Sequence, residues 1–199
     1  MPGIRVGHCT VKTEENHTGV TVIVPGPDNA FAKHYTAAAY IHNGFGKSAG
    51  VVQVEELGTL ETPIANTLNV GKVLDAMVEI VIEQCRKDGI EPQSINPVVG
   101  ECNDCRINHI QKRAIGEKEV REAFALASEE FEEGDVGAGA GTTCYGMKGG
   151  IGSASRVITI GEKEYTIGVL VQSNFGATKD FVLNGEAVGP KILEWKQEK

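Results

Sequence analysis

Three side chains in this sequence have the type and the setting for chemistry at a carbonyl group: Lys148, Asn174 and Asn103. Lys148 lies in the stretch CYGMKGGIG, among apolar residues and glycines, where a lysine is not needed for solubility. A buried lysine loses proton affinity, because desolvation disfavours its charged form, and it can then serve as a base or an orienting donor. The alternative is a surface lysine whose stem covers apolar residues while its ammonium reaches water.

Asn174 ends an apolar run in the stretch GVLVQSNFG, residues 168–176, although the chain shows no Ser-His-Asp set for it to serve. A side-chain amide is a neutral hydrogen-bond donor, which suits a site where a carbonyl oxygen becomes an oxyanion. The alternative is a turn-forming asparagine before Gly176. Asn103 follows the apolar stretch NPVVG and could meet Asn174 and Lys148 from a neighbouring strand.

The strands that must position these side chains are short. Residues 18–24 (TGVTVIV) predict a strand that a Pro-Gly pair closes. Residues 37–41 and 50–54 predict two more strands around the loop HNGFGKSA, and residues 96–100 predict another just before Asn103. The N-terminal part is therefore expected to be rich in β-structure.

Helices and a hairpin complete the pattern. From Val70 onward apolar residues recur at spacings of three and four, which predicts a covered helix that ends near Asp88. Residues 118–131 predict a second amphipathic helix with a Glu-rich outer face, and residues 155–160 and 165–172 predict a hairpin. This order of elements predicts mixed α/β layers with helices covering sheets, not a regular βαβ succession.

Two glycine-rich stretches imitate nucleotide-binding motifs. Residues 44–50 (GFGKSAG) contain the Gly-Lys-Ser that ends a phosphate-binding loop, but Ile41 stands where that motif needs its first glycine. GAGAG at 137–141 matches part of a dinucleotide fingerprint without the βαβ unit around it. We therefore expect no nucleotide site, and a tight, packed loop at 137–141.

The cysteines and carboxylates predict neither a metal centre nor a disulfide framework. An odd number of cysteines fits a reducing compartment. Cys102 and Cys105 form a CxxC, but only His109 lies near as a further ligand, so we interpret the thiols as incidental. The glutamates of residues 119–133 are typical of a solvated helix face, and no cofactor is expected. The cysteines are Cys9, Cys85, Cys102, Cys105 and Cys144.

The composition is that of a folded globular chain. Its 199 residues, 41% of them hydrophobic, can bury the core of one domain. The formal net charge of -8 argues against a nucleic-acid or anionic-membrane partner, because either needs a basic surface. No apolar run reaches the roughly 18 residues that span a bilayer, and the N-terminus lacks the apolar core of a secretion signal, so we expect a cytoplasmic protein.

Four strings carry a resemblance to a known family: QVEELGTLETPIANTLNVG (53–71), NPVVGECND (96–104), MKGGIGSASR (147–156) and GVLVQSNFG, together with the opening PGIRVGH. On these strings the chain resembles the DmpA-type L-aminopeptidase/D-Ala-esterase/amidases and the related β-aminopeptidases. The resemblance implies an α/β fold, the four-layered α/β/β/α sandwich of the DmpA and ornithine acetyltransferase type. It also implies that residues 1–199 are a single domain, the α-chain of a self-cleaving precursor, and that a second chain completes the fold.

The resemblance gives the three polar residues their roles. In such enzymes the new N-terminal Ser or Thr of the second chain is the nucleophile, and its own α-amino group can act as base. Asn174 matches the family's oxyanion-hole asparagine, and Lys148 matches the MKGG lysine that lies near the nucleophile and tunes it. Asn103 falls in a substrate-binding segment that often carries a tyrosine, and the family's NDGYLND is matched here only in part, by NDCRINH.

The sequence reaches Lys199 before any family-like Gly-Ser or Asn-Ser junction, as an α-chain, intact or trimmed, would. Thr142 and Thr143 are the hydroxyls in the glycine-rich loop that might substitute as nucleophile, but neither matches the family's residue.

We therefore predict an aminopeptidase or amidohydrolase that acts on the N-terminal residues of small peptides or amides. Its partners are the C-terminal β-chain of the same precursor and further α/β units in a homo-oligomer. The alternative, from another class, is a non-catalytic family member that serves as a binding or structural protein. Acyl transfer, as in ornithine acetyltransferase, is a third reading that the matching strings disfavour.

Overall fold

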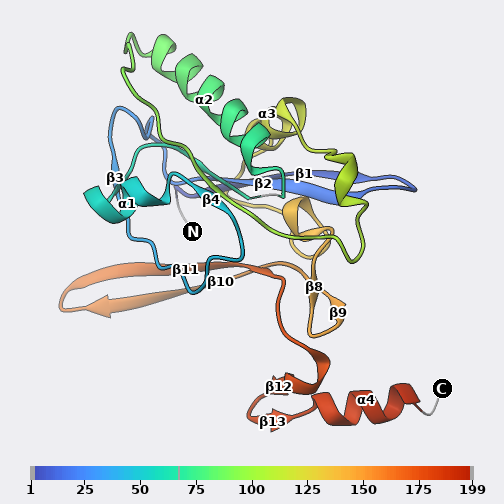
Figure 1. Ribbon diagram of the computed structural model, residues 1–199. Coiled ribbons are helices and arrows are strands. Elements are labelled where there is room, and N and C mark those ends of the chain that lie inside the picture. Colours follow the sequence, from blue (N-terminus) through green and yellow to red (C-terminus); the bar gives the residue numbers. More distant parts are fainter. Residues whose placement is uncertain (1–2, 67, 198–199) are drawn as a thin grey trace.

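The central feature of the fold is a five-stranded mixed sheet in the order β1-β2-β6-β7-β4 (Figure 1). The computed structural model describes residues 3–66 and 68–197, so the parts of the family strings at Pro2 and Thr67, and the end at Lys199, lie outside the described residues. β6 and β7 are parallel, and the other neighbouring strands are antiparallel. The strands are β1 Arg5–Lys12, β2 His17–Val24, β4 Ser48–Ala49, β6 Ile64–Asn66 and β7 Val98–Gly100.

β2 lies inside the sheet and is covered on both faces. Val20, Val22 and Val24 point to one face and Thr18 and Thr21 are also buried, none of them more than 4% exposed. A strand with two covered faces has a continuous run of buried residues, which explains the sequence TGVTVIV. The strand predicted over 18–24 is confirmed by β2, and the strand predicted over 96–100 is confirmed by β7.

Helices α2 (Val70–Lys87) and α3 (Glu117–Ala125) cover one face of the sheet (Figure 1). Met77 of α2 is fully buried, at 0% exposure, in the core that these helices form with β2. α3 approaches β1 so closely that a Cβ at Gly7 would stand 1.9 Å from the carbonyl oxygen of Ala123. Only glycine permits this approach. The first predicted helix is confirmed by α2.

The second predicted helix, over 118–131, is too long. α3 ends at Ala125, and the chain then returns to the edge of the sheet, where Ser128 and Val6 exchange backbone hydrogen bonds of 2.9 and 3.1 Å. The apolar periodicity continues to Phe131, but this bridge to β1 fixes the backbone in another conformation.

The two strands predicted over 37–41 and 50–54 are wrong. Residues 37–41 form no strand, and Val51–Leu57 is a short helix, α1. Gly50 precedes α1 with a left-handed φ of 75°, and a Cβ there would stand 2.2 Å from the carbonyl oxygen of Pro97. This tight turn directs the chain into a helix, so tertiary packing outweighs the β-propensity of the valines.

A long hairpin lies on the side of the sheet opposite to the helices (Figure 1). Its strands are β10 (Gly150–Ile160) and β11 (Lys163–Ser173), so the predicted hairpin is confirmed and is longer than expected. The pairing register places five large apolar side chains on one face, which we call the apolar hairpin face. Their exposed fractions run from 46 to 61%. They are Ile160, Tyr165, Ile167, Val169 and Val171.

Beyond β11 the chain continues into an arm, residues 178–197, that projects away from the sheet and ends in helix α4 (Gly189–Gln197) (Figure 1). Within the described ranges, no helix has both the length and the apolar character to cross a bilayer. Helices over a sheet, with a second β-layer below it, confirm the mixed α/β class. The remaining elements are β3 Tyr35–Thr36, β5 Thr59–Leu60, η1 Ile110–Lys112, η2 Gly137–Gly139, β8 Thr143–Cys144, β9 Met147–Lys148, η3 Thr178–Asp180, β12 Val182–Leu183 and β13 Glu186–Ala187.

Candidate active site

A cavity of ≈ 570 Å³ opens where β7 and β11 end. Three segments line it: the loop that contains Phe45, the residues after β7 and the residues at the end of β11. The cavity therefore brings together Asn103 and Asn174, which lie 71 residues apart in the sequence. Its lining residues are Asn43, Phe45, Gly46, Glu101, Cys102, Asn103, Gln172, Asn174 and Phe175.

Two hydrogen bonds fix the side-chain amide of Asn174. Its Oδ1 accepts the backbone N–H of Thr143 at 3.2 Å, and its Nδ2 donates to the backbone carbonyl of Asn103 at 2.7 Å. An amide nitrogen carries two hydrogens, and the Asn174 side chain also hydrogen-bonds the thiol of Cys102, which lines the same cavity. Asn174 is therefore a held donor on the cavity wall, which is the arrangement that an oxyanion hole needs.

Asn103 contributes mainly through its backbone. Its carbonyl holds Asn174, and its side-chain Oδ1 accepts the backbone N–H of Cys105 at 3.0 Å, a local turn. Buried Asp104 anchors this loop, because it accepts hydrogen bonds from Thr18 Oγ1 and, at 3.0 Å, from Asn108 Nδ2. The loop is thus fixed to the sheet. Asn103 lines the cavity, and its carbonyl forms the hydrogen bond that holds Asn174, which we call the brace.

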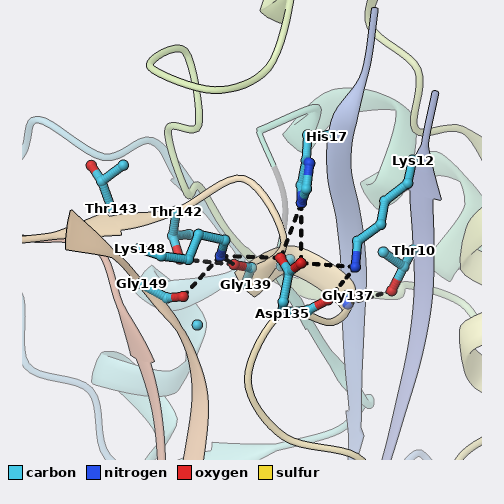
Figure 2. Close-up of polar contacts among 12 residues, drawn as sticks. Thr10, Lys12, His17, Asp135, Gly137, Gly139, Thr142, Thr143, Lys148 and Gly149 are labelled. Carbon is cyan, nitrogen blue, oxygen red and sulfur yellow. Dashed lines mark hydrogen bonds and ion pairs between the residues drawn. The ribbon is translucent and has the colours of Figure 1, made fainter. Parts of the chain in front are cut away.

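Lys148 lies on β9, opposite Thr143 of β8. Its Nζ donates to the carbonyls of Gly139 at 2.9 Å and Gly149 at 2.8 Å, and it lies 3.2 Å from Asp135 Oδ1 (Figure 2). These contacts use all three donors of an ammonium. The side chain is 37% exposed, so Lys148 is an ion-paired lysine at the surface of the chain and not a desolvated one. It does not line the cavity that contains Asn174 and Asn103.

Sequence reasoning missed Asp135, the carboxylate at the centre of Figure 2. It lies 2.8 Å from Lys12 Nζ, 3.0 Å from His17 Nε2 and 3.2 Å from Lys148 Nζ. Burial by itself raises the pKa of this carboxyl, but the hydrogen bonds from the three bases outweigh it and hold the pKa well below its ordinary value. The signal in the sequence was an acidic residue just before the packed loop Gly137–Gly139.

Sequence reasoning also missed Glu101, the first residue after β7, whose side chain is only 4% exposed. It forms three hydrogen bonds with Lys47, which we call the clasp. The Lys47 N–H donates to Glu101 Oε2 at 2.7 Å, Lys47 Nζ donates to Oε1 at 3.0 Å, and the Glu101 N–H donates to the Lys47 carbonyl at 2.8 Å. The lysine of GFGKSAG thus binds a carboxylate, and Glu101 is one of the residues that line the cavity.

Thr142 and Cys102 are poor nucleophiles. Thr142 is fully buried and donates to the Gly139 carbonyl at 2.9 Å. Burial, with the nearby charge of Asp104, raises the pKa of Cys102 to about 12, so its thiol stays protonated at neutral pH. All five cysteines are free, and the part of the chain that the structure describes contains no cluster of three or more metal-binding side chains.

The model of peptidase family S58 matches residues 1–199 of this chain. The chain belongs to peptidase family S58. Its resemblance to the DmpA-type aminopeptidases and β-aminopeptidases is thereby confirmed.

Other S58 relatives support the fold. The crystal structure of the PH0078 protein from Pyrococcus horikoshii OT3 matches with a TM-score of 0.92 and 40% identity, over 98% of this chain and 58% of that one. The L-aminopeptidase D-Ala-esterase/amidase from Ochrobactrum anthropi, described as a variant of the Ntn hydrolase fold, matches with a TM-score of 0.85 and 30% identity, over 96% of this chain and 56% of that one.

A curated S58 relative, the β-peptidyl aminopeptidase BapA of Sphingosinicella xenopeptidilytica, is 34% identical over 204 residues. That match covers 96% of this chain and 50% of the relative. The chain thus spans about half the length of the curated relatives it matches.

Proposed function

We propose that this chain is the α-chain of an aminopeptidase that removes the N-terminal residue from small peptides or amides. In this proposal the β-chain of the same precursor supplies an N-terminal Ser or Thr as nucleophile. The observation that carries the proposal is the fixed Asn174 amide, which lines a cavity that Glu101 also lines. A donor for a carbonyl oxygen beside a partner for an ammonium suits a substrate with a free amino terminus.

The apolar hairpin face supports the presence of a second chain. Five large apolar side chains on one face of β10 and β11 are about half exposed here, and soluble proteins rarely leave such a face uncovered. The S58 relatives are also nearly twice as long as this chain. We propose that the β-chain covers this face and thereby supplies the fourth layer of the sandwich.

The reaction then proceeds by acyl transfer to the nucleophile. The hydroxyl oxygen attacks the carbonyl carbon of the scissile amide, and its proton passes to the α-amino group of the same residue. The carbonyl oxygen becomes an oxyanion that accepts a hydrogen bond from the second N–H of Asn174, in place of the Cys102 thiol. The α-ammonium gives its proton to the leaving nitrogen as the amide C–N bond breaks, and the amine departs. Water then hydrolyses the ester that remains, which releases the acid and restores the hydroxyl. Glu101 binds the ammonium of the substrate throughout.

Lys148 acts on the nucleophile from the other side of Thr143 in this proposal. A neighbouring positive charge lowers the pKa of an amine, so the ammonium of Lys148 keeps the α-amino group of the nucleophile neutral and able to accept a proton. Asp135 and the two loop carbonyls hold that ammonium in place.

The test is to express the complete reading frame and to determine the intact masses and N-terminal sequences of the purified chains. We expect two chains, the second beginning with Ser or Thr, and hydrolysis of aminoacyl amides or β-aminoacyl amides. A single uncleaved chain without turnover would instead support the non-catalytic alternative, and turnover of acetylornithine would support acyl transfer.

A further inference from the structure

Two exposed phenylalanines stand on the wall of the cavity. Phe45 is 83% exposed and Phe175 is 54% exposed, whereas most of the other lining side chains are polar. An exposed aromatic ring beside a polar cavity is a surface that an apolar group of a ligand can cover, with a gain in binding.

Phe45 belongs to the end of the cavity that contains Glu101. It stands two residues before Lys47, so its Cα lies within about 7 Å of the Cα of Lys47, the residue clasped to Glu101. An Asx turn shapes the loop, because the Phe45 N–H donates to Asn43 Oδ1 at 3.0 Å. The clasp and the turn therefore hold the loop that carries Phe45 beside the residues that follow β7.

Phe175 directly follows Asn174 and lines the same cavity. Its ring meets Tyr145 edge to face at a centroid distance of 5.1 Å, and its carbonyl accepts the Tyr145 N–H at 2.8 Å. Tyr145 in turn stacks on Phe181 at 4.8 Å. Phe175 is thus part of a packed aromatic group beside the oxyanion donor.

We propose that Phe45 is a specificity-determining residue, which selects substrates with a large apolar side chain on the N-terminal residue. The inference rests on the proposed function. A substrate that places its carbonyl oxygen at Asn174 has its first side chain in the same cavity, and the most exposed apolar side chain on the wall is Phe45. Phe175 is less exposed, because it packs against Tyr145.

The test uses the complete, processed enzyme and two anilide substrates that differ only in the first side chain, benzyl or methyl, in an α-amino and a β-amino series. The measured quantity is the benzyl-to-methyl ratio of kcat/KM. A lost apolar contact in a specificity pocket changes such a ratio by about tenfold to two-hundredfold, so Phe45→Ala lowers the ratio by about that factor. Phe45→Leu, which keeps an apolar side chain, lowers it less.

Tyr40→Ala is the matched control, because Tyr40 lies in the same loop region and is 88% exposed but does not line the cavity. We expect it to leave the ratio unchanged. An unchanged ratio in Phe45→Ala, or an equal loss for both substrates, overturns the role of Phe45 while the proposed function stands. A wild-type enzyme that hydrolyses neither series overturns both.

Discussion

The helix-covered sheet and the hairpin differ in what they bury. Where α2 and α3 cover the sheet, the side chains between the two layers are almost completely removed from water, and Val22 of β2, Met77 of α2 and Val120 of α3 are each 0% exposed. In the hairpin, an equally regular set of apolar residues on β10 and β11 remains about half exposed. Both regions present apolar side chains on a regular face, so the difference in their exposure lies in the presence or absence of a cover.

The difference teaches that the two regions depend on different parts of the protein. The sheet and its helices form a core from this chain alone, whereas the hairpin is completed from outside it in our proposal. The cavity lies at the junction, because Asn103 follows β7 of the sheet and Asn174 follows β11 of the hairpin.

The largest effect is expected in the covered core. Met77→Ala removes a fully buried side chain and leaves a cavity, which costs about 2–5 kcal/mol of the free energy of unfolding. Met147→Ala is the matched control, because Met147 is 36% exposed and should change that free energy by less than about 0.5 kcal/mol. Chemical denaturation measures both. Equal effects would contradict the assignment of the core.

The next effect concerns the junction. Asn174→Ala removes the proposed oxyanion donor and should lower kcat about a hundredfold to a thousandfold in the complete enzyme, or about 3 kcal/mol. KM should change little, because the contact strengthens in the transition state. Asn184→Gly, in the exposed turn between β12 and β13, is the control and should retain full activity. Undiminished turnover in Asn174→Ala would remove this role.

A smaller effect should separate the two faces of the hairpin. Ile167 and Val157 are 51% and 59% exposed here, but they lie on opposite faces. If the β-chain covers the apolar hairpin face, Ile167→Ser should destabilise the complete enzyme by about 1–2 kcal/mol, and Val157→Ser by less than about 0.5 kcal/mol. Thermal unfolding measures the difference. Similar values for the two variants would argue against a cover on that face.

The smallest effect concerns Asp135, which ties the packed loop to β1, β2 and β9. Its pKa is lowered in the folded protein, so its stabilisation is present above the ordinary carboxyl value of about 4 and is lost as the pH falls below it. The side chain is 43% exposed, so solvent screening limits the stabilisation to about 1 kcal/mol.

Asp135→Asn should therefore be less stable than the wild type at pH 7, and the difference should shrink at pH 3. Denaturation at the two pH values measures it. Glu162→Gln, in the exposed hairpin turn, serves as the control and should leave the pH dependence as it is. A difference that persists unchanged at pH 3 would show that the carboxylate charge is not what stabilises the loop.

The spacing of apolar residues predicted those elements whose backbone depends mainly on residues that are close in the sequence. The three-and-four spacing after Val70 gave α2, and the apolar strands around Gly161 gave the hairpin. The pattern failed where a distant segment decides the backbone. Pro97 packs against Gly50 and the chain enters α1, and Val6 pairs with Ser128 and α3 ends early.

The same distinction between local and distant contacts applies to the residues of the site. The proximity of Asn103 and Asn174 could be expected, because each follows an apolar strand. The partners of Asp135 and Glu101 could not, because Lys12 lies 123 residues from Asp135 and Lys47 lies 54 residues from Glu101. Such pairings follow from the topology of the sheet, and no spacing in the sequence encodes them. The apolar and glycine neighbours of Lys148 suggested a desolvated lysine for the same reason. In the structure Lys148 is instead ion-paired with Asp135.

The brace between Asn174 and the carbonyl of Asn103 joins the hairpin's root to the sheet through a single amide. In the proposed enzyme, a displaced hairpin would move that amide away from the carbonyl oxygen of the substrate. Turnover would then depend on the correct assembly of the hairpin with the sheet.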